Sequence, residues 1–82
     1  MENDEILESI ELKADLAKEA ISMLSPAYQT VFNLYVIEEY THKEIAEMLG
    51  VSEGTSKSNL AKAKQNLKKI LLEKYEKIDE LL

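Results

Sequence analysis

Residues 41–61 read THKEIAEMLGVSEGTSKSNLA and contain the start and stop signals of two closely spaced helices. Thr41 and Glu44 fit the S/T-x-x-E capping box, which satisfies two free backbone N–H groups at a helix start. Gly50 is expected to end that helix in the left-handed conformation that glycine tolerates. Ser52 then caps the next helix. Two helices joined by about three residues that include a glycine are typical of a helix-turn-helix.

The two helices of this motif must share an apolar contact. We expect Ala46 at their closest approach, because a larger side chain would push them apart. The other expected contributors are Ile45, Leu49, Val51 and Leu60. Ser56 falls on the same side, so its hydroxyl needs a partner, for which we expect the carbonyl of Ser52. An ordinary helical hairpin could share this spacing.

Working outward toward the N-terminus, two further helices are expected. Apolar residues recur at helical spacing at Leu7, Ile10, Ala14, Ala17, Ile21 and Leu24. Ser25 and Pro26 are the start signal of a second helix over residues 26–39, which is apolar on most sides and therefore expected to be the most buried. We expect its aromatic residues to pack in the core rather than stack on bases: Tyr28, Phe32, Tyr35 and Tyr40.

Toward the C-terminus, the fourth helix continues at helical spacing. Its later apolar stripe is Ile70, Leu71, Ile78 and Leu81. Two interpretations stay open for this stripe: a seam for a partner helix, or part of the core. The predicted fold class is all-α, a four-helix domain that contains a helix-turn-helix and an extended C-terminal recognition helix.

Composition excludes several classes of function. The 82 residues suffice for one small domain, and they include no cysteine and one histidine, so neither a disulfide nor a Cys/His metal site is expected. No nucleophile–base pair is evident, so the chain is not expected to be an enzyme or to hold a cofactor. No apolar run approaches the roughly 20 residues that span a membrane. A cytoplasmic protein without a small-molecule substrate is expected.

Charge is distributed unevenly along the chain. The net charge is -6, but residues 54–72 contain five lysines and no acidic residue, whereas residues 1–20 contain seven acidic residues and two lysines. Steps of about 100° around the fourth helix place four of these lysines opposite the apolar side and Lys64 at the edge of that face. Small residues and lysines on one face suit a helix that enters the major groove of DNA. A solvated lysine face is the alternative, but the tight turn and the short capped helix favour DNA binding.

Two residues at the start of the third helix have open roles. His42 could contact a phosphate of DNA, but we favour an exposed residue of the capping turn. Lys43, its neighbour, is the better candidate for a phosphate contact.

The chain resembles region 4 of bacterial sigma factors, and the extracytoplasmic-function type in particular, in two stretches: LSPAYQTVF at residues 24–32 and YTHKEIAEMLGVSEGT at residues 40–55. The resemblance covers roughly residues 10–72. It implies that the domain binds the minus-35 element of promoter DNA and docks on the β-subunit flap of RNA polymerase. It also implies an anti-sigma factor as a further partner.

The resemblance implies roles for individual residues. The positions that face bases are Lys57, Ser58, Ala61 and Lys62. The positions that contact phosphates are Thr55, Asn59 and Lys64. The family commonly has arginine near positions 59, 62 and 64, and lysine lacks the planar fork with which arginine binds a base in two places. Ser56 stands where many members have valine.

The resemblance also implies a domain organisation. A sigma factor needs a region 2, and no aromatic, basic segment of this chain resembles one. We therefore expect an excised C-terminal domain over residues 10–82, preceded by the tail of an acidic linker at residues 1–9. Two other functions stay open: a protein-interaction module, and a stand-alone dimeric repressor whose C-terminal stripe makes the dimer.

Overall fold

The computed structural model describes residues 14–81 of the chain, with side chains for residues 14–74. A first helix occupies residues 14–22. It is followed by α2 (Pro26–Phe32), the π-helical turn η1 (Asn33–Ile37), α3 (His42–Leu49) and α4 (Glu53–Leu81). The predicted all-α class is confirmed, and α3 and α4 form the predicted helix-turn-helix.

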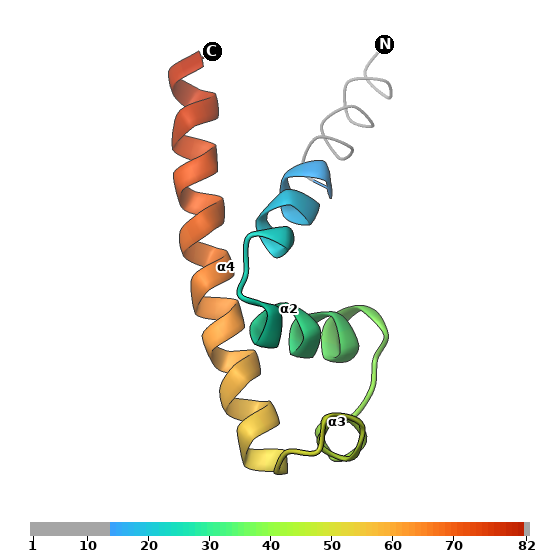
Figure 1. Cartoon of the computed structure of the whole chain (residues 1–82). Coiled ribbons are helices and arrows are strands. Elements are labelled where there is room, and N and C mark those ends of the chain that lie inside the picture. The colour runs from blue at the N-terminus through green and yellow to red at the C-terminus, as the bar shows by residue number, and fades with distance from the viewer. Residues whose placement is uncertain (1–13, 82) are drawn as a thin grey trace.

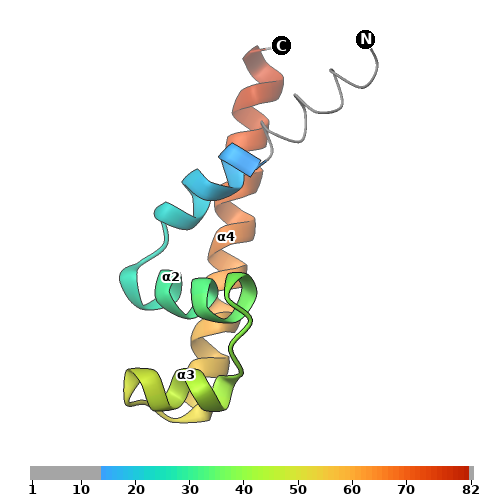
Figure 2. The same ribbon diagram turned by 90° about the vertical axis from the view of Figure 1, so that its right-hand side faces the viewer.

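The long α4 is the spine of the domain. Its 29 residues make a rod of about 43 Å at 1.5 Å per residue. The first helix, α2 and α3 lie along one side of this rod, with α3 beside its N-terminal end (Figure 1). In the view turned by 90°, α2 and α3 both cross the lower half of α4 (Figure 2). The other side of α4 is therefore left open along its length.

One apolar cluster joins these elements. Its buried members are Leu24, Val31, Phe32, Ile45, Leu60 and Ala63. Ala20 of the first helix is also fully buried, whereas Ala14, which the spacing places inward, is exposed. Leu7 and Ile10, from the same predicted stripe, lie outside the described residues, as does the predicted linker at residues 1–9.

The start of α2 follows the predicted signal with one difference. Pro26 is the first helical residue and Ser25 occupies the N-cap position, but the Ser25 side chain makes no capping hydrogen bond. The backbone carbonyl oxygen of Ser25 accepts the first hydrogen bond of the helix, from the N–H of Gln29 at 2.9 Å. Proline suits this position because it has no N–H group that would need an acceptor.

The predicted helix over residues 26–39 changes type in its second half and ends at Ile37. The α-helical hydrogen bonds end at Phe32, and a π-helical turn follows in which the N–H of Glu38 donates to the Asn33 carbonyl at 3.0 Å. Glu39 then takes a positive φ of 62°, a left-handed conformation that costs a residue with a Cβ roughly 1 kcal/mol or more. The chain therefore leaves the helix before Thr41.

The same change overturns the expected burial of this element. Val31 and Phe32 are buried, and Tyr28 packs partly against the core as predicted. In η1 and just beyond it the large apolar residues are exposed: Tyr35, Val36, Ile37 and Tyr40. The wider π-helical turn shifts their side chains away from the face that α2 presents to α4, so the core prediction for Tyr35 and Tyr40 is wrong.

The capping predictions in the helix-turn-helix are confirmed. The N–H of Glu44 donates to the Thr41 hydroxyl oxygen and the N–H of Thr41 donates to the Glu44 carboxylate, both at 3.1 Å. Gly50 is left-handed with φ 67° and ψ 35°. The N–H of Val51 donates to the carbonyl of Ala46 at 3.0 Å, which closes the end of α3.

The apolar contact of the motif is narrower than predicted. Ile45, Ala46 and Leu60 are buried, but Leu49 and Val51 are 41% and 36% exposed. Both flank Gly50 in the turn between α3 and α4, and Figure 1 shows this turn at the end of the domain. The inward prediction for these two residues is therefore wrong.

Candidate nucleic-acid interface

The N-terminal half of α4 has two distinct faces. Ser56, Leu60 and Ala63 are buried against α2 and α3. Four predicted base-facing residues are all exposed: Lys57, Ser58, Ala61 and Lys62. At about 100° per residue these four share one side of the helix, roughly opposite the buried side. The fold therefore presents them together toward solvent.

This exposed face is basic over a long stretch of α4. Every lysine between residues 54 and 72 is exposed, and no carboxylate interrupts them: Lys57, Lys62, Lys64, Lys68 and Lys69. The acidic residues of α4 nearest to this stretch are Glu53, in its first turn, and Glu73 beyond it. Because like charges on a low-dielectric wall add their fields, this face attracts a polyanion despite the net charge of -6.

The first turn of α4 leaves a hydroxyl ready to donate. The Ser52 hydroxyl oxygen accepts from the N–H of Thr55 at 3.0 Å, as the capping prediction requires. The same Ser52 hydroxyl donates to the Thr55 hydroxyl oxygen at 2.9 Å. Thr55 is exposed, and its own hydroxyl hydrogen stays free to donate. Helix N–H groups at this end add a further attraction for anions.

The buried hydroxyl of Ser56 has a partner that the sequence did not indicate. Its oxygen lies 2.8 Å from Nδ1 of His42, so the expected bond to the Ser52 carbonyl is wrong. His42 is half-buried rather than exposed, which corrects the preferred interpretation of this residue. Its ring stacks on Tyr35, with centroids 4.3 Å apart and planes at 18°. No local pattern predicts this contact, because it joins residues from three elements.

The other predicted contact residues lie around the basic face. Lys43 is exposed on α3, a separate element from α4. Lys64 is exposed and borders Leu67 and Leu71. Asn59 is half-buried at the edge of the packed side, so it shares no face with the four base-facing positions. Contact of these residues with DNA stays a prediction.

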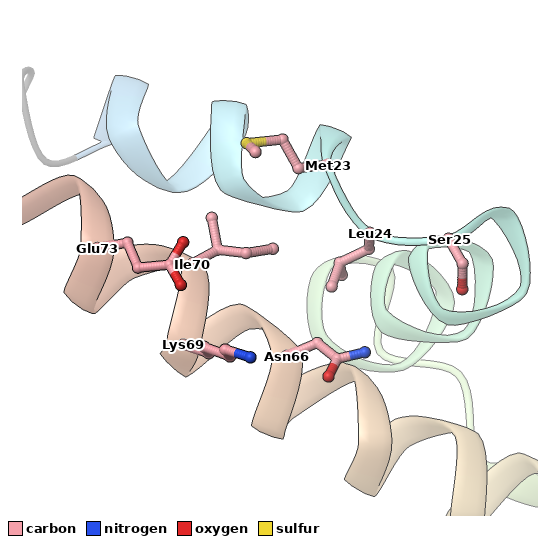
Figure 3. Close-up of a pocket in the computed structure, with 7 residues that line it drawn as sticks. All are labelled: Met23, Leu24, Ser25, Asn66, Lys69, Ile70 and Glu73. Atoms are coloured by element: carbon pink, nitrogen blue, oxygen red, sulfur yellow. The ribbon is translucent and has the colours of Figure 1, made fainter.

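A shallow pocket meets this face at Lys69 and lies between α4 and the turn that follows the first helix (Figure 3). Its lining residues are Met23, Leu24, Ser25, Asn66, Lys69, Ile70 and Glu73. In the close-up, Ile70 and Leu24 point into the gap between the two helices, with Lys69 and Asn66 below it. Ile70 packs against the core cluster, so the later stripe partly joins the core. Leu71 is half-buried, and the side chains of Ile78 and Leu81 lie outside the described ones.

Two other kinds of site are absent from residues 14–81. No group of three His, Asp or Glu residues there could hold a metal ion. Of the helices described, none is long and apolar enough to cross a membrane. The basic face of α4 is thus the strongest candidate site that the described residues offer.

Comparison with known proteins points to the same part of the chain. A family model described as sigma-70, region 4, matches residues 14–67. These residues comprise the first helix, α2, η1, α3 and the N-terminal half of α4. No curated protein and no solved structure gave a match.

Proposed function

Since the chain belongs to the sigma-70 region 4 family, which forms the DNA-binding part of sigma factors and is not a catalytic family, we propose that it reads the minus-35 element of promoters. Its place of action would be the cytoplasm, on promoter DNA and RNA polymerase. The observation that carries the proposal is the exposed, acid-free side of α4 that holds Lys57, Ser58, Ala61 and Lys62.

The proposed docking places the first turns of α4 in the major groove. Ala61 and Ser58 are small, so the helix can approach base edges closely at these positions. Lys57 and Lys62 flank them and can donate to acceptor atoms of guanine. Thr55 and Lys64 would contact phosphates from the same helix, and Lys43 from α3, which fixes the register of the helix on the duplex.

The expected affinity of the domain for DNA is low, so we expect it to bind promoters as part of a larger assembly. Each lysine–phosphate contact releases counterions, so binding is salt-sensitive. A single module of this size falls short of the affinity of complete operator-binding proteins. Docking on the polymerase β flap would raise the effective concentration of the domain at the promoter and supply the remainder.

Charge reversal tests the proposal. Fluorescence anisotropy with a candidate minus-35 duplex and a scrambled duplex would compare the wild type with Lys57→Glu and Lys62→Glu. Each reversal is expected to abolish measurable binding, whereas Lys18→Glu, on the exposed side of the first helix, should retain it at low salt. Unchanged affinity in both α4 variants would overturn the assignment of the recognition helix.

A second candidate function rests on a different part of α4. An apolar strip there is lined by Leu67, Leu71 and Leu72 and flanked by Lys64 and Lys68, and Leu72 is 56% exposed. Such a strip suits an amphipathic partner helix with acidic flanks, such as an anti-sigma factor, or a second copy of the chain. Leu72→Lys should abolish this binding and spare DNA binding, while light scattering would detect a dimer.

A further inference from the structure

We propose that His42 is a positioning residue for DNA recognition. Its hydrogen bond to Ser56 would fix the orientation of the first turns of α4. The inference rests on the proposed function, since it concerns how the recognition helix is aimed. His42 itself need not touch DNA. Its imidazole would instead fix where the residues after Ser56 point.

The hydrogen bond between His42 and Ser56 is placed where it can control this geometry. His42 is the first residue of α3, and Ser56 lies in the first turns of α4. Their 2.8 Å contact is the one side-chain hydrogen bond between α3 and α4 among the side chains described. Ser56 is fully buried, so water does not compete for its hydroxyl.

The position of Ser56 determines that of two proposed base-reading residues. Lys57 and Ser58 follow it directly in the chain. A rotation or shift of α4 about Ser56 therefore moves both side chains relative to a groove. Valine at position 56 could fill the space, but an apolar contact has no direction. A hydrogen bond to a fixed acceptor defines both distance and angle.

The acceptor is itself held from two sides. The capping box of Thr41 and Glu44 fixes the backbone directly before His42. Tyr35 stacks on the imidazole with planes at 18°, which restricts the rotation of the ring. We infer that the His42 ring accepts the Ser56 hydroxyl hydrogen at Nδ1 and carries its own hydrogen on Nε2. The three elements η1, α3 and α4 thus meet at one polar contact.

Binding experiments on the whole chain test the positioning role. The dissociation constants for the candidate and the scrambled duplex would be measured for the wild type, His42→Ala, His42→Asn and Ser56→Ala. His42→Ala should weaken binding to the candidate duplex by roughly threefold to tenfold, the range of one net hydrogen bond. Binding to the scrambled duplex should change by less than about twofold, because it depends on charge alone.

A conservative variant and a double variant distinguish a positioning role of His42 from general damage to the fold. His42→Asn keeps an acceptor close to the Nδ1 position and should recover most of the lost discrimination. The double variant His42→Ala/Ser56→Ala should lose no more than either single variant, because both remove the same contact. Glu47→Ala, at an exposed site of α3, is the matched control and should behave as the wild type. Equal weakening with both duplexes, or no weakening, would overturn the proposal.

A measurement without DNA distinguishes failure of this inference from failure of the proposed function. Long-range ¹⁵N correlation spectra of His42 should show an unprotonated Nδ1 at neutral pH, whose shift moves in Ser56→Ala and stays in Glu47→Ala. If the Nδ1 chemical shift is the same in the wild type and in Ser56→Ala, His42 and Ser56 are not hydrogen-bonded and the proposal is wrong. A wild type that binds both duplexes equally would overturn minus-35 reading, and the aiming role with it. Urea unfolding would establish that each variant is folded at the binding temperature.

Discussion

Glu19 and Lys74 are 55 residues apart in the chain, yet the carboxylate Oε2 of one lies 2.6 Å from Nζ of the other. This ion pair links the first helix to α4. Lys74 is 23% exposed and Glu19 is 66% exposed at the side chain. Because the pair is open to solvent on the Glu19 side, it adds little to stability at high salt.

Acid should weaken this link. The hydrogen bond from Lys74, and then its charge, hold the pKa of Glu19 below its ordinary value of 4.5. The folded protein therefore binds this proton less readily than the unfolded chain. The stabilisation is present above pH 4.5 and is lost as pH falls through the lowered pKa of the folded state.

The test compares urea unfolding of the wild type and Glu19→Gln across this window. We expect Glu19→Gln to be less stable than the wild type at neutral pH, and the difference to shrink as pH falls through the lowered pKa of Glu19 and the carboxylate becomes protonated. Glu47→Gln, which changes an exposed carboxylate of α3, serves as the control. A stability difference between the wild type and Glu19→Gln that persists undiminished in acid would contradict the pairing.

Loss of the capping box should destabilise the helix-turn-helix. Thr41→Ala removes the acceptor of the Glu44 N–H and is expected to lower the free energy of unfolding by about 1 kcal/mol. Thr41→Ser keeps the hydroxyl and should lie close to the wild type. Chemical denaturation measures both, and equal stabilities of the alanine and serine variants would show that the cap contributes nothing.

The two glycines should respond to alanine in opposite directions. Gly50 has φ 67°, and nothing lies within 4 Å of an added Cβ, so the cost of Gly50→Ala is conformational, roughly 1–2 kcal/mol. Gly54 is helical and a Cβ there would make an ordinary contact with Ser52 at 3.8 Å. Gly54→Ala should therefore stabilise the domain by up to about 1 kcal/mol. Thermal unfolding of both variants decides the matter, since a harmless Gly50→Ala would contradict the left-handed turn.

The salt dependence of DNA binding should show which lysines contact phosphates. If Lys64 contacts a phosphate, Lys64→Ala should reduce the slope of log K against log salt by roughly 0.9 and weaken binding to all sequences alike. Lys18→Ala, on the exposed part of the first helix, should leave the slope close to that of the wild type. A slope that is the same in both variants would remove Lys64 from the interface.

Local signals in the sequence predicted the helix-turn-helix well. The capping box at Thr41, the left-handed Gly50 and the Ser52 cap depend on residues within a few positions of one another, so the chain itself specifies them. The two faces of α4 follow from the helical period alone, which is why buried Leu60 and Ala63 and exposed Lys57 were predicted correctly.

Features that depend on packing could not be predicted in this way. The change from α2 to the π-helical turn η1 has no proline or glycine to mark it, and the left-handed residue there is Glu39. The partner of Ser56 comes from a different helix, 14 residues away. Exposure of Tyr35 and Val51 depends on where neighbouring helices end rather than on hydrophobicity. Spacing along one helix carries none of this information.

The most direct test of minus-35 recognition by α4 is an NMR titration of the ¹⁵N-labelled chain with short duplexes at low salt. Our account predicts amide shift changes concentrated between Thr55 and Lys69, larger for a candidate minus-35 duplex than for a scrambled one. Equal changes with both duplexes would reduce the interaction to attraction between lysines and phosphates. An α4 whose amides do not respond to either duplex would contradict the account and make the polymerase β flap the next ligand to titrate.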